Sequence, residues 1–190
     1  MLQRHALLAV LSAPLLLFMT SSTSVAQNVS FFDTRNSPNL LNFGAGVFNI
    51  SDTDGGNKAA LFQLDLVPGV SLVKFGDSFY VQPYVGAWAT HEGSVMGYAG
   101  IQGLIPIGRR VEARPFMAIG VYDNGGGREL KSVALFHSGI SIFYVSRPGW
   151  RFGATFTHQS HGEILSSDSE NPGANNFLAS VAMPWDQISN

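Results

Sequence analysis

Residues 111–121 read Val-Glu-Ala-Arg-Pro-Phe-Met-Ala-Ile-Gly-Val, and they alternate between two kinds of side chain. The odd-numbered positions are apolar, whereas the even-numbered positions include Glu112 and Arg114. Successive side chains of a β-strand point to opposite faces, so parity sorts these residues onto two sides of one strand. The stretch therefore predicts a strand with one apolar face and one face that carries charge.

The same alternation recurs along the chain and predicts eight strands. They lie near residues 40–51, 58–67, 78–89, 96–107, 110–122, 131–145, 149–160 and 174–185. Turn-forming residues separate them, as in the run Asp123-Asn124-Gly125-Gly126-Gly127. The connections at Gly108 and Pro148 are short and the 161–173 connection is long, which is the asymmetry of outer-membrane barrels. The 68–77 connection is long for a periplasmic turn.

The composition excludes several classes of protein. The chain has 190 residues, of which 45% are hydrophobic and only 13% are charged, so a disordered protein is excluded. It has no cysteine, which excludes a disulfide scaffold and a cysteine-ligated metal site. An isoelectric point near 6.2 argues against a nucleic-acid partner.

The first 26 residues have the features of a secretory signal peptide. Arg4 and His5 precede an almost wholly apolar run from Ala6 to Met19, and Ser24-Val25-Ala26 is a small-x-small cleavage signal. We expect residues 1–26 to be removed and residues 27–190 to form one barrel domain. The alternative is an N-terminal membrane anchor, although the run is short for a spanning helix.

Two architectures share this alternation: a membrane barrel with its apolar face outside, and a soluble β-sandwich or lipocalin-like barrel with its apolar face inside. The low charge content favours the membrane barrel, in which Asp65, Arg114 and Arg151 would lie inside in mutual pairs. We predict an all-β fold, an eight-stranded antiparallel transmembrane barrel of the bacterial outer membrane. Residues near strand ends are expected to form its interfacial aromatic belt: Trp88, Tyr144, Trp150 and Trp185.

One predicted strand combines this pattern with reactive side chains. Residues 152–163 read Phe-Gly-Ala-Thr-Phe-Thr-His-Gln-Ser-His-Gly-Glu, so His158 and Ser160 share the lipid-facing side. Asn175 lies on the same face of the next strand, and an in-register hairpin would bring it beside His158. A serine becomes nucleophilic when a histidine takes its proton and a third group orients that histidine. The pattern therefore indicates an esterase that acts on a membrane lipid.

The segment resembles the lipid A 3-O-deacylase family, also described as acyloxyacyl-hydrolase-like outer-membrane proteins. The resemblance rests on the His-x-Ser motif at 158–160 and the Asn-Pro-Gly loop at 171–173, within residues 120–185. It implies an eight-stranded barrel with His158 as base, Ser160 as nucleophile and Asn175 as orienting residue. Two departures are an amide at Asn175 instead of a carboxylate, and His161 where the family has asparagine.

Other residues near this motif are candidates for parts of the same site. Candidates for the oxyanion hole and its loop are His161, Gly162, Asn171 and Gly173. Loop carboxylates that could replace Asn175 as orienting group are Glu163, Asp168 and Glu170. We expect no metal and no cofactor, because the histidine spacing lacks a metal-binding pattern. His137 is expected in the barrel lumen.

The function expected from the resemblance is removal of a hydroxyacyl chain from lipid A of lipopolysaccharide in the outer leaflet. The alternative is a non-catalytic small barrel with a structural or adhesion role. The sequence leaves open whether the barrel forms a homodimer. A porin is disfavoured, because eight strands leave an interior only wide enough for side chains.

Overall fold

The computed structural model describes residues 29–33, 37–52, 58–76, 79–161 and 173–185. The predicted signal peptide and the loop candidates Gly162, Glu163, Asp168, Glu170 and Asn171 lie outside these ranges. Within them the strands are β1 (Val29–Asp33), β2 (Leu40–Phe48), β3 (Ala59–Val67), β4 (Ser71–Phe75), β5 (Phe79–Thr90), β6 (Val95–Ile107), β7 (Val111–Asp123), β8 (Ala134–Val145), β9 (Arg151–Ser160) and β10 (Ala174–Pro184). No helix in the described ranges is long and apolar enough to cross a membrane.

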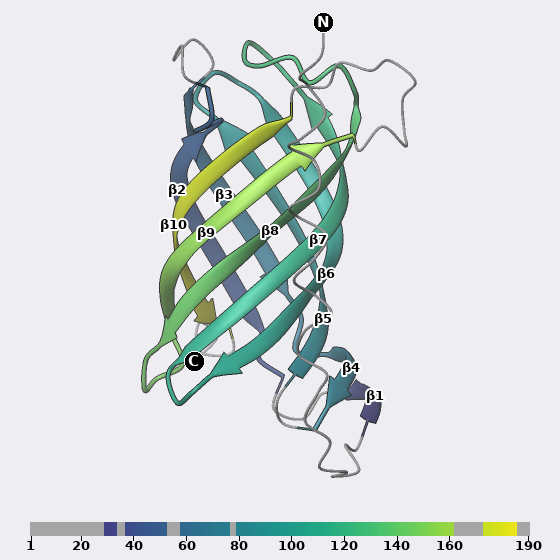
Figure 1. Ribbon diagram of the computed structural model, residues 1–190, viewed down its shortest axis with the longest axis vertical. Helices are drawn as coiled ribbons and strands as arrows, with labels where there is room; N and C mark the ends of the chain where they lie inside the picture. The colour runs from purple at the N-terminus through teal and green to yellow at the C-terminus, as the bar shows by residue number, and fades with distance from the viewer. Residues whose placement is uncertain (1–28, 34–36, 53–57, 77–78, 162–172, 186–190) are drawn as a thin grey trace, which may run out of the picture.

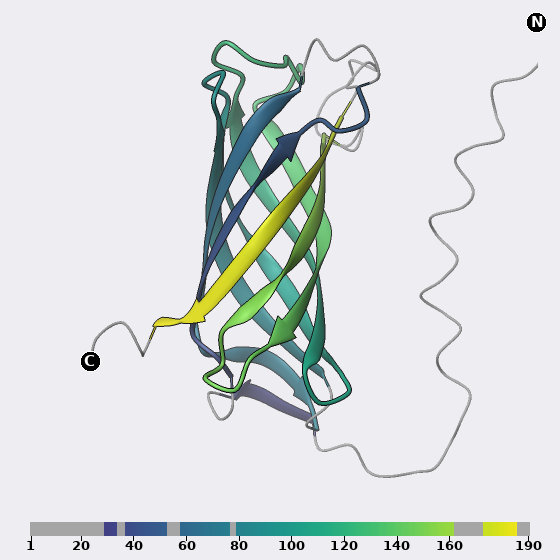
Figure 2. The same ribbon diagram turned by 90° about the vertical axis from the view of Figure 1, so that its left-hand side faces the viewer.

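Eight of these strands close into an antiparallel barrel (Figures 1 and 2). Its order is β2, β3, β5, β6, β7, β8, β9 and β10, and β10 pairs with β2 to complete the ring. These are the eight predicted strands, with ends that differ by up to three residues. The predicted architecture is therefore confirmed.

Strands β1 and β4 extend the sheet outside the barrel ring. β4 lies in the connection between β3 and β5 and pairs with the start of β5, where Phe75 faces Phe79. β1 then pairs along β4. This ribbon lies at the lower end of the barrel in Figure 1. It accounts for the length of the 68–77 connection, which contains a short strand that the sequence analysis did not predict.

The outer wall of the barrel is apolar, as parity predicts. Met117 is 56% exposed at the middle of β7, whereas Glu112 and Arg114 on the same strand are buried. An apolar outer wall around an interior that holds the charged side chains is the arrangement of a barrel surrounded by lipid. A soluble barrel would have the opposite polarity.

The prediction that Trp88 belongs to the interfacial belt is wrong. Trp88 is only 2% exposed and packs inside the barrel against Phe48 and Tyr122, with ring centroids 5.4 and 5.7 Å away. The reason is parity, because Trp88 lies an even number of residues from the inward-facing Gln82. Tyr144 and Trp185, by contrast, are exposed near the lower strand ends.

Two groups of polar side chains hold the buried charges of the interior. Glu112 forms ion pairs with both Arg114 and Arg151. Asp65 instead accepts hydrogen bonds from neutral donors: Asn42 at 2.7 Å, Gln63 at 2.8 Å and Tyr98 at 2.6 Å. The predicted mutual pairing of Asp65 with the arginines is thus replaced by two separate networks. Each network supplies the partners that a buried charge requires.

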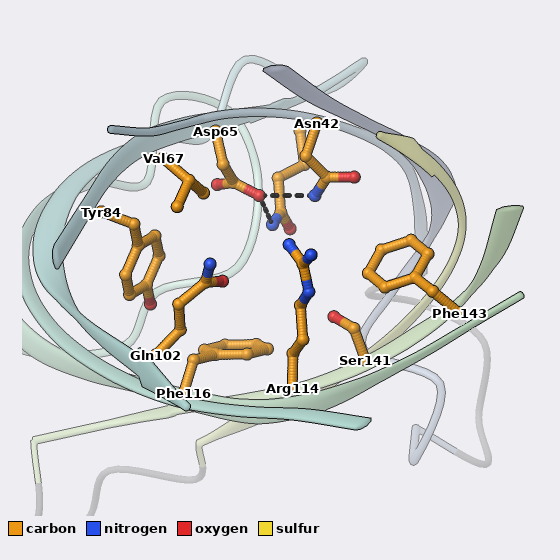
Figure 3. Close-up of a pocket in the computed structure, with 10 residues that line it drawn as sticks. Asn42, Asp65, Val67, Tyr84, Gln102, Arg114, Phe116, Ser141 and Phe143 are labelled. Carbon is orange, nitrogen blue, oxygen red and sulfur yellow. Dashed lines mark hydrogen bonds between the residues drawn. The ribbon is translucent and has the colours of Figure 1, made fainter. Parts of the chain in front are cut away.

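A small cavity lies between these two networks (Figure 3). Asn42, Asp65, Gln102 and Arg114 point into it from different parts of the barrel wall. Its volume of about 20 Å³ is enough for about one water molecule. An organic substrate does not fit in this space.

Candidate functional site

The candidate residues gather at one end of the barrel. β9 ends at Ser160 and β10 begins at Ala174, so both strands have their site residues at the upper end in Figure 1. The longer connection between β7 and β8 is at this end, whereas the short turns after β6 and β8 are at the other. Outer-membrane barrels carry short turns on the periplasmic side, so we assign the site end to the cell exterior.

The register of three neighbouring strands places three polar residues in one row. Asn175 of β10 pairs with His158 of β9, which in turn pairs with Ser138 of β8. Directly opposed residues of an antiparallel pair have Cβ atoms about 4.5–5.5 Å apart. The approach of Asn175 to His158 that the sequence predicts is therefore present. All three side chains are half-buried on the outer face of the barrel.

A hydrogen bond joins the first two residues of this row. His158 Nδ1 lies 2.7 Å from Asn175 Oδ1. The carbonyl oxygen can only accept, so in this arrangement Nδ1 carries the proton and Nε2 keeps its lone pair. An imidazole in this tautomer has its basic nitrogen free for a hydroxyl group.

Ser160 shares the outer face with His158 but is not bonded to it. Ser160 is half-buried at the end of β9, opposite Phe136 of β8. Within the described part of the chain, no hydrogen bond connects its hydroxyl group to His158. Catalytic hydrogen bonds are often long in free enzymes and shorten when substrate binds. The structure thus contains the contact between His158 and Asn175, but no contact between Ser160 and His158.

Gly173 lies against the edge of the His158 ring. It has a φ angle of +59°, and a Cβ atom built on it would be 3.0 Å from Cε1 of His158 and 3.5 Å from Nε2. This loop candidate therefore contacts the imidazole directly. The absence of a side chain leaves room for the ring, and glycine adopts the positive φ angle without steric cost.

His161, the other described loop candidate, has its side chain elsewhere. It is 2% exposed and buried, like Gln159 two residues earlier on the lumen side of β9. Its imidazole therefore does not join His158 and Asn175 on the outer face.

A hydrogen-bonded polar layer lies on the inner side of the wall behind the site. Asn176 Nδ2 donates to Thr157 Oγ1 and to Gln159 Oε1, both at 2.9 Å. Gln159 Nε2 lies 2.9 Å from Nδ1 of His137, which is fully buried in the lumen as predicted. These contacts hold β9 and β10 together from inside, next to His158 and Asn175.

The structure adds two residues that the sequence analysis did not place at the site. Ser138 of β8 lies opposite His158 of β9. Ser138 has the same parity as the outward-facing Ile140, so the alternation along β8 could have predicted its position on the outer face. Ser51 follows β2, and its Oγ accepts a 2.7 Å hydrogen bond from Asn175 Nδ2. These two partners are 124 residues apart, so local sequence has no signal for their contact.

Comparisons with known proteins agree with the architecture. The outer membrane enzyme PagL superposes with a TM-score of 0.60 at 13% identity, over 76% of this chain and 99% of that one. The chain has the fold of a bacterial outer-membrane β-barrel. Two further structures are similar at lower scores. Neisserial surface protein A has a TM-score of 0.49 at 12% identity, over 83% of this chain and 99% of its own. The Yersinia pestis outer membrane protein Ail has a TM-score of 0.43 at 11% identity, over 76% and 99%.

No family model and no curated protein matches the sequence. At the identities above, the structural likeness concerns the fold. The chemistry of this barrel must therefore be argued from its own residues.

Proposed function

We propose that this barrel is an outer-membrane serine esterase that removes a hydroxyacyl chain from lipid A. The observation that carries the proposal is the 2.7 Å contact between His158 Nδ1 and Asn175 Oδ1 on the outer face, beside Ser160. The fold likeness to PagL, which is described as an outer membrane enzyme, supports it. So does the resemblance of the His-x-Ser motif and Asn-Pro-Gly loop to the lipid A 3-O-deacylase family.

The proposed reaction follows the serine hydrolase scheme. Ser160 Oγ attacks the ester carbonyl carbon while His158 Nε2 takes the hydroxyl proton. The tetrahedral intermediate then collapses, the C–O bond to the sugar breaks, and His158 returns the proton to the departing sugar oxygen. Water hydrolyses the acyl-serine by the same sequence and releases a free hydroxy fatty acid.

The position of the residues matches a lipid substrate better than a soluble one. Each unpaired polar group that faces hydrocarbon lowers the stability by several kcal/mol, so a polar cluster on this face points to a function. The interior cavity beside Asp65 and Arg114, of about 20 Å³, is too small for a lipid substrate. An ester located just below the headgroups of the outer leaflet would meet the cluster from the side.

A non-catalytic barrel is the second candidate, and two observations favour it. Within the described residues Ser160 does not hydrogen-bond His158, and Asn175 cannot stabilise an imidazolium by charge. A barrel that had lost its catalytic role would have these features. It would then serve in the membrane as a structural or adhesion protein.

Mass spectrometry of lipid A separates the two candidates. The full-length protein is expressed in an outer membrane of known lipid A composition, beside Ser160→Ala and Ser138→Ala variants. The proposal expects loss of one hydroxyacyl mass with the parent protein and with Ser138→Ala, but not with Ser160→Ala. Unchanged lipid A with a correctly folded parent barrel, shown by heat-modifiable migration, would establish the non-catalytic reading. Loss of activity in Ser138→Ala alone would make Ser138 the nucleophile.

A further inference from the structure

The turn after β2 reaches the candidate site from the far side of β10. Asn175 Nδ2 donates to Ser51 Oγ at 2.7 Å, while the backbone N–H of Ile50 donates to the Asn175 carbonyl at 2.7 Å. The backbone N–H of Asn49 donates to Asn176 Oδ1 at 2.9 Å. Three successive residues of this turn therefore hold the first residues of β10.

Two contacts of Asp52 hold this turn in place. The N–H of Asp52 donates to the Asn49 carbonyl at 3.2 Å, and the Asp52 carboxylate lies 4.0 Å from the guanidinium of Arg128 in the connection after β7. Ser51 is thus presented to Asn175 from a fixed backbone. Its own side chain is exposed, so substitution there opens no cavity in the core.

An amide orienting group needs this help, whereas a carboxylate does not. The two oxygens of a carboxylate both accept, so either can face an imidazole N–H. An amide has one acceptor and one donor end, and only one orientation presents the oxygen to His158 Nδ1. The flipped orientation would present the NH₂ group, move the imidazole proton to Nε2 and remove the lone pair that Ser160 requires.

We infer that Ser51 is a positioning residue of the site: by accepting from Asn175 Nδ2, it holds the amide with its oxygen on His158 Nδ1. The inference deepens the proposed esterase function and rests on it for its catalytic meaning. The structural part of the inference, the orientation of the amide and the tautomer of His158, can be measured without any activity.

The experiment compares Ser51→Ala and Ser51→Thr with the parent in the full-length barrel. Ser132→Ala is the matched control, because Ser132 lies in another connection at the same end and its hydroxyl donates to the Ala134 carbonyl at 2.8 Å. We expect Ser51→Ala to lower the deacylation rate about tenfold, since misorientation of reacting groups is costly. Ser51→Thr should restore most of the rate, and Ser132→Ala should match the parent.

A double-mutant test separates positioning from a general loss of structure. In the Asn175→Asp background both oxygens of the carboxylate accept, so Ser51→Ala should change the rate less than about twofold, and the two effects are then not additive. An equal tenfold loss in both backgrounds would overturn the inference.

Nitrogen-15 NMR of the His158 ring in detergent micelles tests the geometry itself. The His158 signals are assigned by comparison with His158→Gln. The parent should show a protonated Nδ1 and an unprotonated Nε2, and Ser51→Ala should shift the signals toward the other tautomer. Unchanged signals in Ser51→Ala would overturn the inference. An inactive parent protein would overturn the esterase proposal alone, because the NMR result decides the role of Ser51 independently.

Discussion

His158 and Asn175 are direct partners in the antiparallel pair of β9 and β10, and their side chains meet at 2.7 Å between Nδ1 and Oδ1. Seventeen residues separate them along the chain. The contact is on the outer wall of the barrel. It gives the base of the proposed reaction a defined tautomer.

The amide at Asn175 is expected to limit the rate of the proposed esterase. Asn175→Asp should raise the deacylation rate about threefold to tenfold, because a carboxylate also stabilises the imidazolium that forms during attack. Asn175→Ala should lower it by a similar factor or more. Time courses of lipid A deacylation by mass spectrometry measure both changes. Equal rates in all three proteins would show that a different group orients His158.

Gly173 is expected to be intolerant of any side chain. Gly173→Ala would place a Cβ atom 3.0 Å from His158 Cε1 at a φ angle of +59°, so the ring must move. Gly76→Ala is the matched control, because Gly76 has a φ angle of +55° but open space around its Cβ position. Both should lose about 1 kcal/mol of stability from the left-handed backbone, and only Gly173→Ala should lose activity. Equal activity of the two variants would contradict the assigned contact.

Glu112 is expected to be essential for the stability of the barrel. Glu112→Gln leaves the buried Arg114 and Arg151 without a counter-charge, which should lower the free energy of unfolding by about 3–5 kcal/mol. Glu129→Gln, at an exposed position, should change it by less than about 0.5 kcal/mol. Urea unfolding in lipid vesicles, followed by tryptophan fluorescence, measures both. A small effect at Glu112 would mean that water reaches the two guanidinium groups.

The outer face of β7 offers a test of membrane embedding. Met117→Arg at the middle of the strand should lower the free energy of unfolding in vesicles by about 2–4 kcal/mol, and Val111→Arg at its periplasmic end by about 0–1 kcal/mol. Both residues are exposed on the same face of the same strand. The two costs should become similar in urea unfolding from detergent with a thinner apolar layer. No depth dependence in vesicles would contradict the assigned membrane belt.

The alternation of apolar and polar side chains along each strand predicted most of the fold. In residues 111–121 parity placed Glu112 and Arg114 on one face and Met117 on the other, and the low charge content assigned the charged face to the interior, as the structure has it. The same rule, applied strictly, would also have placed Trp88 inside. Its position near a strand end suggested an interfacial belt, and the structure shows that parity was the stronger guide.

Parity is a local property, because the pleated backbone of a strand turns successive side chains to opposite faces. Contacts between strands are not local. Part of the 68–77 connection forms β4, which pairs with both β1 and β5. Arg114 and Arg151 share Glu112 because the closed barrel places β7 and β9 around one interior. The sequence by itself therefore determined the eight strands of the barrel, the two sets of side chains on each strand and the pairing expected for His158 and Asn175. Only the tertiary structure decided that Ser51 reaches Asn175, because that contact exists through ring closure between β10 and β2.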